Sequence, residues 1–239
     1  MLCVANRAWA YRPFDGTDAD VAALREMELE VGPAEVTLSE RRNTWVVPAI
    51  IVNYGFAPNF ELVLEGRHRL APPDRSPEQR SQITDSAISV KHVLREGCLQ
   101  EHAGVSIANE WSLLLPDTGS SQPPGAEITT IFSARSQALT LHLNVYNELS
   151  RQHRYVASVG PIVEGPFTWL FRPVIEIIVA REFGSARFVR GLYGSALLGG
   201  IGRVSDDLSV DLAARYARAD GTREETVRAG FTWAFDARL

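Results

Sequence analysis

Residues 138–149 read Ala-Leu-Thr-Leu-His-Leu-Asn-Val-Tyr-Asn-Glu-Leu. Aliphatic side chains occupy every second position from Leu139 to Val145, and polar side chains such as His142 and Asn144 occupy the positions between them. Successive side chains of a β-strand point to opposite faces, so this alternation predicts a strand with one aliphatic face and one polar face. The same period of two recurs from Met27 onward, whereas helical periodicity is almost absent.

The repeated pattern predicts about twelve strands, each of about ten residues and bounded by turn-forming residues. They span residues 27–38, 44–54, 60–70, 86–95, 104–115, 126–134, 138–149, 154–164, 169–182, 188–198, 207–218 and 224–235. An even number of antiparallel strands returns both chain ends to one side, and the longest connections, 71–85 and 116–125, then lie at the other side. The sequence therefore predicts an all-β fold, a transmembrane antiparallel up-and-down β-barrel of about 12 strands in the outer membrane of a Gram-negative bacterium.

The composition argues against several other classes of protein. The chain has a net charge of -5 and no basic cluster, so we expect no nucleic-acid partner. It has no apolar run of about eighteen residues, the length that a transmembrane helix needs. Two cysteines, Cys3 and Cys98, cannot build a disulfide framework or a thiolate metal site. The five histidines lack metal-ligand spacing, and we expect neither a metal nor a cofactor.

The chain divides into four predicted regions. Residues 1–10 end in Ala8-Trp9-Ala10, a small-x-small pattern typical of the end of a signal peptide, and we expect them to be the remnant of one. Residues 11–26 form an N-terminal periplasmic segment, in which 19–25 could make a short helix. Residues 27–235 form the barrel, and residues 236–239 form a C-terminal tail.

Alternation alone does not say which face of the barrel is apolar, because a soluble lipocalin-like barrel has the same period. Twelve strands enclose a wide lumen that aliphatic side chains fill poorly, which favours a polar interior and a lipid-facing aliphatic exterior. A base on the lipid face would cost about 2–4 kcal/mol at the bilayer midplane. The predicted lumen residues carry both charges; they are Glu61, Glu65, Arg67, Lys91, Glu110, His142, Asn144, Glu176, Asp211, Arg215 and Arg228, with Glu28 and Glu30 on the same face.

The last predicted strand resembles the C-terminal β-signal of outer-membrane proteins. Its pattern is a polar residue, a glycine and two alternate aromatic residues: Arg228, Gly230, Trp233 and Phe235. The resemblance implies that the barrel-assembly machinery is a partner during biogenesis, although most such proteins end at the aromatic residue. Aromatic residues also cluster at strand ends, which predicts contact with the headgroup level of the membrane, that is, with outer-membrane lipid and lipopolysaccharide.

Further segments resemble the transporter-like outer-membrane family named for the MetA pathway of phenol degradation. The segments, which span nearly the whole chain, are Arg12-Pro13-Phe14, Asp15 to Asp18, Met27 to Glu30, Pro48 to Gly55, Phe60 to Leu62, Leu141 to Asn144, Val204 to Asp211 and Gly230 to Trp233. The resemblance implies a channel or transporter for a small solute, which could be hydrophobic or aromatic.

Two other functions stay open at this stage. A structural or adhesive outer-membrane barrel would have the same strands without transport, and a soluble β-barrel that binds a ligand is a more remote alternative. We do not expect an enzyme. His142 and Asn144 are superficially similar to the catalytic residues of the twelve-stranded outer-membrane phospholipase, but the neighbouring Thr140 supplies no suitable nucleophile and the predicted face points inward.

Overall fold

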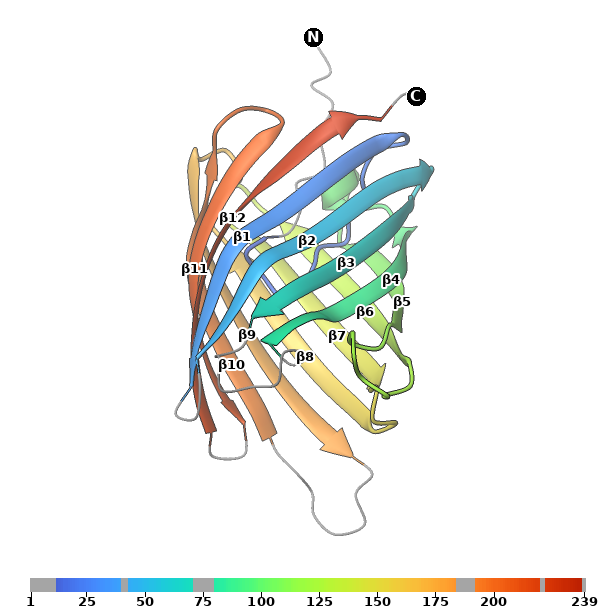
Figure 1. The fold of residues 1–239 in the computed structure, drawn as a ribbon. Coiled ribbons are helices and arrows are strands. Elements are labelled where there is room, and N and C mark those ends of the chain that lie inside the picture. The colour runs from blue at the N-terminus through green and yellow to red at the C-terminus, as the bar shows by residue number, and fades with distance from the viewer. Residues whose placement is uncertain (1–11, 40–42, 71–79, 184–191, 220–221, 238–239) are drawn as a thin grey trace.

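The computed structural model describes residues 12–39, 43–70, 80–183, 192–219 and 222–237. The predicted signal-peptide remnant at 1–10 and the last two residues of the predicted tail lie outside the described residues. Figure 1 shows one barrel with both ends of the chain at the same end of the cylinder. Among the described helices, none is long and apolar enough to cross a membrane.

Twelve antiparallel strands form a closed barrel in which each strand pairs with its neighbours in sequence. Their bounds are β1 Glu26–Ser39, β2 Thr44–Ala57, β3 Phe60–Leu70, β4 Ser81–Arg95, β5 Ser106–Leu114, β6 Gly125–Arg135, β7 Thr140–Leu149, β8 Tyr155–Glu164, β9 Phe171–Phe183, β10 Leu192–Arg203, β11 Leu208–Ala219 and β12 Thr222–Asp236. A short 3-10 helix, η1 (Cys98–Gln100), lies between β4 and β5. The predicted fold class is confirmed.

The barrel closes where β1 pairs with β12. The register runs from Glu26 opposite Asp236 to Ser39 opposite Glu224, with one irregularity between Val31 and Ala34. An open sheet would leave a row of unpaired N–H and C=O groups along each edge. In lipid there is no water to satisfy those groups, so closure is what allows a sheet to span the membrane.

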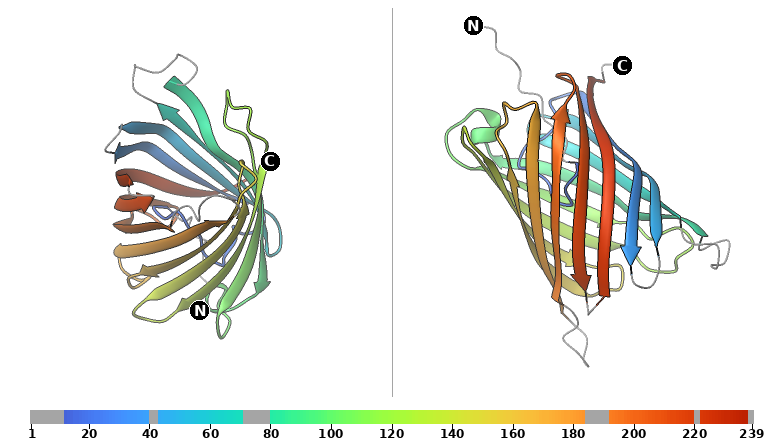
Figure 2. Two further views of the ribbon diagram at one scale, coloured as in Figure 1. Left: turned by 90° about the horizontal axis from the view of Figure 1, so that it is seen from below. Right: turned by 90° about the vertical axis from the view of Figure 1, so that its left-hand side faces the viewer.

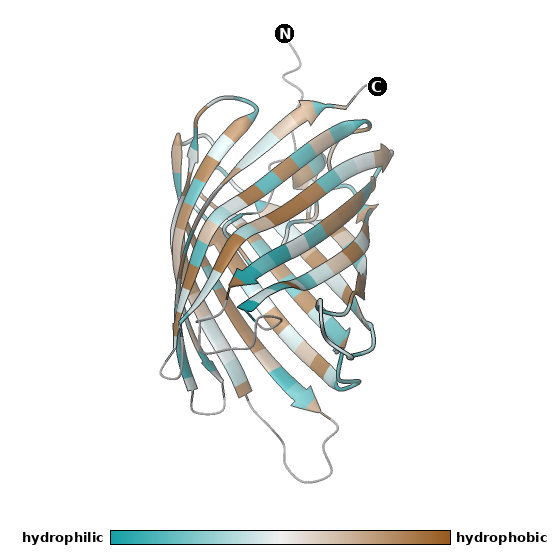
Figure 3. Ribbon diagram, viewed as in Figure 1, coloured by the Kyte–Doolittle hydropathy of each residue, from teal (hydrophilic) through white to brown (hydrophobic). Residues whose placement is uncertain are grey.

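The two faces of the wall differ as the alternation predicts. Leu141 and Leu212 point outward and are 46% and 61% exposed, whereas Asn144 and Glu176 point inward and are 0% and 1% exposed. Figure 3 shows the resulting bands of apolar and polar residues along the strands. In a membrane, lipid tails cover such an exterior, so the exposed aliphatic side chains do not contact water.

Three strands depart from their predicted bounds. β2 continues to Ala57, β4 begins at Ser81 and β10 continues to Arg203, whereas the other strands agree to within two residues. The predicted start of the tenth strand, at 188–191, lies outside the described residues. The break predicted before Ser86 is an irregularity in the ladder between β3 and β4, where Asp85 adopts a positive φ of 52°. Pairing resumes on both sides of it, so a turn-like sequence is accommodated inside a strand.

Gly199, Gly200 and Gly202 lie within β10, although this glycine-rich stretch of the sequence predicts a loop. A Cβ at Gly200 would lie 2.2 Å from the ring of Phe171 on β9, so the absence of a side chain makes room for that ring. Gly200 pairs with Pro173 in the ladder. Glycine in a strand marks a close approach here rather than a chain break.

The N-terminal residues 12–25 enter the barrel instead of remaining beside it, as the inner trace in Figure 2 shows. The short helix predicted at 19–25 is wrong, because this stretch is irregular. Its amides bond to other groups: Ala19 N–H donates to Ser133 at 2.9 Å and Ala22 N–H donates to Glu61 at 2.6 Å. A helix would have used those donors within its own backbone.

We expect Leu143→Arg to destabilise the barrel in lipid vesicles by about 2–4 kcal/mol, because it places a base on the lipid face near mid-strand. Ser158→Arg is the control, since Ser158 lines the interior cavity, where carboxylates can neutralise the new charge. Urea unfolding followed by the gel shift between folded and boiled samples measures both. Equal losses for the two variants would contradict the assignment of the faces.

Candidate functional site

Residues 12–25, here named the plug, occupy the half of the barrel nearest the chain ends. The Arg12 side chain fixes the first residue of the plug: its Nε donates to Asp211 at 3.2 Å and its Nη2 donates to the Ala229 carbonyl at 3.1 Å. A Cβ at Gly32 or Gly230 would lie within 2.6 Å of this guanidinium. The two glycines on β1 and β12 therefore create the space in which the guanidinium lies flat against the wall.

Asp15 is the charged centre of the plug. It pairs with Arg228 at 2.7 Å and with Arg215, while its backbone N–H donates to Glu176 at 2.9 Å. Burial raises the pKa of Asp15, but the guanidinium groups of Arg228 and Arg215 outweigh burial and hold that pKa well below its ordinary value. The carboxylate therefore stays ionised at neutral pH and links the plug to β11 and β12.

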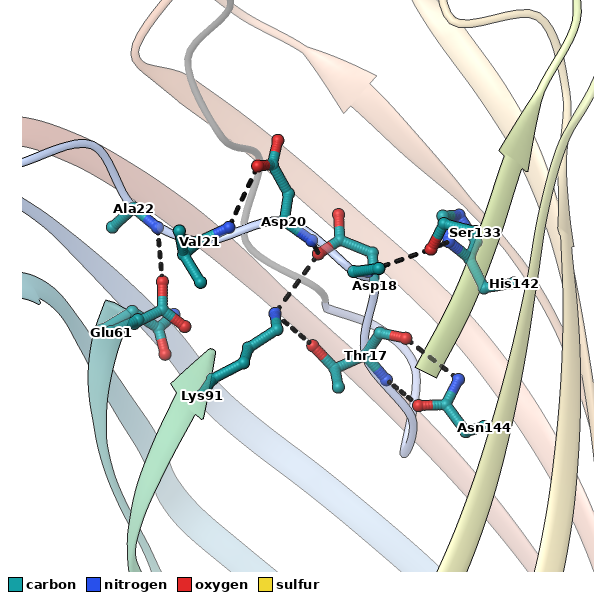
Figure 4. A network of polar contacts seen from close by, with 12 residues as sticks. Thr17, Asp18, Asp20, Val21, Ala22, Glu61, Lys91, Ser133, His142 and Asn144 are labelled. Atoms are coloured by element: carbon teal, nitrogen blue, oxygen red, sulfur yellow. Dashed lines mark hydrogen bonds and ion pairs between the residues drawn. The ribbon is translucent and has the colours of Figure 1, made fainter. Parts of the chain in front are cut away.

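The middle of the plug bonds to β4 and β7 (Figure 4). Thr17 N–H donates to Asn144 Oδ1 at 3.1 Å, and Asn144 Nδ2 donates back to the Thr17 carbonyl at 2.9 Å. Lys91 Nζ donates to Thr17 Oγ1 at 3.0 Å and lies 3.3 Å from Asp18 Oδ1. Side chains of the wall thus take the place that a pairing strand would have.

A buried polar chain supports the plug at Ala19. Ser133 Oγ, which accepts the Ala19 N–H, lies 2.7 Å from His142 Nδ1, and His142 Nε2 lies 3.2 Å from Glu164. Arg172 then pairs with Glu164 at 2.8 Å. Ser, His and a carboxylate in this order are also the parts of a nucleophilic triad. Here Ser133 is fully buried and its hydroxyl already holds the plug, so the arrangement is an anchor.

The last part of the plug carries a carboxyl group with a shifted pKa. Burial and the neighbouring Asp18 raise the pKa of Asp20 from 3.8 to about 6, although the Gln100 side chain, which donates to Asp20 at 2.9 Å, partly opposes the shift. Gln100 belongs to η1, which covers this end of the barrel, and Leu99 beside it packs with Ala19 in a small apolar cluster.

A cavity of about 610 Å³ extends from the plug toward the opposite end of the barrel. Its lining is acidic: among the described residues, ten carboxyl groups and four basic groups face it. The carboxyl groups are Asp15, Asp20, Glu28, Glu30, Glu61, Glu65, Asp85, Glu110, Glu127 and Glu148, and the basic groups are Arg67, Lys91, Arg151 and Arg215. Phe14, Tyr146 and Tyr193 are its aromatic residues.

The residues predicted to line the lumen all point into the interior, in two groups. Glu61, Glu65, Arg67, Lys91, Glu110 and Arg215 line the cavity. His142, Asn144, Glu176, Asp211 and Arg228 are buried beside the plug. For the predicted assembly signal, Arg228 and Gly230 face the plug, while the rings of Trp233 and Phe235 lie 4.8 Å apart. Its role in biogenesis stays a prediction.

Sequence reasoning missed several residues that the structure brings together. Glu127 and Glu148 share the inner face with Thr129 and Asn144, so the alternation alone could have found them. Ser133 could have been placed on the inner face in the same way, but not opposite His142. No pattern in the sequence predicted that Asp15 would reach Arg215 and Arg228, because the pairing spans almost the whole chain.

We expect Asp15→Asn to loosen the plug, because it leaves two buried guanidinium groups without their carboxylate. The amide hydrogens of Gly16, Thr17 and Ala19 bond to the wall and should exchange slowly in the natural sequence and at least tenfold faster in the variant. Hydrogen exchange of the barrel in micelles measures this, with Asp206→Asn in an exposed turn as the control. Unchanged protection in Asp15→Asn would contradict the proposed anchor.

The raised pKa of Asp20 gives docking of the plug a pH dependence. A carboxyl group whose pKa is higher in the folded state stabilises that state when protonated, so the contribution is complete below about pH 3.8 and is lost as the pH rises through about 6. We expect the Ala19 amide to be better protected at pH 5 than at pH 7, after correction for intrinsic exchange. Asp20→Asn should abolish the difference; a difference that persists would contradict this cause.

No family model matches the chain, and no curated protein sequence matches it either. Solved structures match its fold. The KdgM porin is 12% identical with a TM-score of 0.55, over 88% of this chain and 99% of that one. The NanC porin is 9% identical with a TM-score of 0.61, over 86% and 98%. The COG4313 outer membrane channel from Pseudomonas putida F1 is 8% identical with a TM-score of 0.61, over 93% and 100%.

At sequence identities of 12%, 9% and 8%, these matches show a common fold and nothing more. The shared fold and the closed strand order agree with the outward-facing aliphatic side chains. The chain is therefore an integral outer-membrane β-barrel with the fold of porins and channels.

Proposed function

We propose that the protein is an outer-membrane channel for small solutes whose inner half is closed by the plug. The observation that carries this proposal is the cavity of about 610 Å³, which is bounded by the plug and lined by charged side chains rather than packed with apolar ones. If the chain ends are periplasmic, as in other outer-membrane barrels, the cavity faces the cell exterior and the plug lies on the periplasmic side.

The plug is attached in a way that permits its release. The backbone N–H groups of Gly16, Thr17, Ala19 and Ala22 donate to side chains of the wall, not to the backbone of a neighbouring strand. Every strand of the barrel is already paired on both sides without the plug. Withdrawal of residues 12–24 would therefore break mainly side-chain contacts, while Arg25 keeps its backbone bonds to Gly55 and Ala237 and the barrel itself remains closed.

The charge of the lining predicts which solutes pass. Ten carboxyl groups against four basic groups create a negative potential in a confined space, which concentrates cations and repels anions. Two narrower proposals rest on the sequence resemblance alone. They are membership of the MetA-type transporter family and a hydrophobic or aromatic solute. The lining adds a preference for positive charge, since its aromatic residues are outnumbered by carboxyl groups.

Planar-bilayer recordings test the closed state. We expect small, infrequent openings for the natural sequence and a several-fold larger conductance when residues 12–24 are deleted, because removal of the plug joins the cavity to the other end of the barrel. Asp15→Asn, which keeps the plug in the chain, should open more often than the natural sequence. If the deletion variant folds, shown by its gel shift, and conducts nothing, the structural or adhesive alternative is favoured instead.

Reversal potentials in a KCl gradient test the charge preference. We expect the channel to favour K⁺, and we expect the double variant Glu127→Gln and Glu148→Gln to lose much of that preference, because both side chains line the cavity. Glu225→Gln is the control, since Glu225 pairs with Arg223 away from the cavity lining. A preference for Cl⁻, or equal effects of the variants, would contradict this assignment.

A further inference from the structure

The basic side chains of the cavity are already occupied. Lys91 contacts Asp18 of the plug at 3.3 Å, and Arg215 pairs with Asp15 of the plug. Arg67 lies 3.7 Å from Glu35 on β1. Each of the three forms its ion pair with a residue outside the acidic wall, which we define as Glu65, Glu110, Glu127 and Glu148 on β3, β5, β6 and β7.

Arg151 forms no ion pair with the acidic wall among the described residues. Its Nε donates to the Leu115 carbonyl at 2.6 Å and its Nη2 donates to the Ser86 carbonyl at 3.0 Å, so the guanidinium ties two connections together. Among the described residues, Glu65, Glu127 and Glu148 form no ion pair. The cavity thus holds an excess of carboxyl groups over basic groups, ten against four among the described residues.

The clearest observation concerns Glu28, a buried carboxyl group at the inner end of the cavity. Its side chain on β1 is 2% exposed, lines the inner end of the cavity and has no hydrogen-bond or ion-pair partner among the described residues, and its Oε1 is fully buried. Its nearest charged neighbours are also acidic and include Glu61, Glu30 and Asp18. A buried carboxyl group without a hydrogen-bonding partner is costly, so its position favours a ligand that can supply a donor here.

The outer part of the cavity also holds carboxyl groups that, within the described ranges, have no ion-pair partner. Glu127 on β6 lies directly opposite Glu148 on β7 in the ladder. Like charges in direct cross-strand opposition destabilise a sheet. Glu127 is near the start of β6 and Glu148 is near the end of β7, whereas Glu28 is near the start of β1. The acidic pair and Glu28 therefore lie at opposite ends of the cavity.

We propose that this cavity binds small organic cations with primary ammonium groups, with Glu28 as the inner contact and the Glu127–Glu148 pair as the outer one. An ammonium group has three donors and a compact charge, which suits carboxylates that converge from several strands. No group of acidic or histidine side chains among the described residues is arranged to hold a metal ion. The cavity volume is within the usual range for small-molecule sites.

The proposal rests on the proposed channel function, because it names the class of solute that the same lumen would carry. A linear diamine suits such a lining, since it can present an ammonium group at each of its two ends. Phe14 and Tyr146 of the lining offer apolar surface to the methylene chain between them. The hydroxyl of Tyr146 is buried and has no partner, so it can also accept a hydrogen bond from the ligand.

Titration calorimetry of the full-length barrel in detergent tests the site without any measurement of conductance. The probes are 1,4-diaminobutane, the neutral 1,4-butanediol and the anionic succinate. We expect saturable binding of the diamine alone, weakened at least about tenfold by Glu28→Gln and by the double variant Glu127→Gln and Glu148→Gln, because each loses a charge-assisted contact. Glu225→Gln should bind as the natural sequence does.

The outcomes separate this site from the channel function. Absent diamine binding, equal binding of 1,4-butanediol, or full affinity in Glu28→Gln would overturn the cation site, even if the barrel conducts. Diamine binding to a barrel that is electrically silent with and without the plug would support the site and overturn the channel. Because Glu28 contacts the ligand in this proposal, its loss should lower the affinity for the diamine and leave assembly of the barrel unchanged.

A stability measurement excludes trivial misfolding of the Glu28 variant. We expect Glu28→Gln to unfold at the same temperature as the natural sequence or at a higher one, because it removes an unpartnered buried charge. Addition of 1,4-diaminobutane should raise the unfolding temperature of the natural sequence and not that of the variant. A Glu28→Gln barrel that unfolds at a clearly lower temperature would show that Glu28 has a structural partner, contrary to the proposal.

Discussion

The ladder between β1 and β12 is the constraint on which the rest of the structure depends. Lipid offers no partners to backbone N–H and C=O groups, so a membrane-spanning sheet must close on itself. Closure fixes an inside and an outside, and alternation then sends the aliphatic side chains to the lipid and the ionised ones to the lumen. The internal polar network exists because a closed wall of twelve strands encloses more space than its own apolar residues fill.

The plug supplies charged partners to some of the ionised side chains inside the barrel. Asp15 and Asp18 bring carboxylates to Arg228, Arg215 and Lys91, and of these bases Arg228 also lies 3.7 Å from Glu35. Side-chain hydrogen bonds from Asn144 and Glu61 satisfy the plug's backbone amides in turn. A segment without secondary structure can stay inside a barrel because the wall supplies the partners that water or a neighbouring strand would have supplied. The same contacts leave the barrel's own ladder untouched.

The plug also determines where the remaining charge lies. By engaging Lys91 and Arg215, it pairs two of the four bases of the cavity and leaves Glu28, Glu65, Glu127 and Glu148 without an ion-pair partner among the described residues. The ion pairs of the plug with Lys91 and Arg215 lie in the inner half of the lumen, whereas the Glu127–Glu148 pair lies in the outer half. This asymmetry links the closure of the barrel to its expected preference for cations, since withdrawal of the plug would also free the bases that it holds.

The sequence by itself determined the number of strands, their pairing order and the face to which each side chain points, because a period of two is a local property that a closed sheet preserves. It placed His142, Asn144, Glu176 and Arg228 in the interior for that reason. It failed at 19–25 and at the bounds of β4 and β10, where distant groups override local preference: wall side chains take the plug's amides, and the Phe171 ring fills the space beside Gly200. Only the tertiary structure decided that Asp15 meets Arg215 and Arg228 and that Glu28 has no partner, because these relations join residues far apart in the chain and depend on the path of a segment with no periodic pattern.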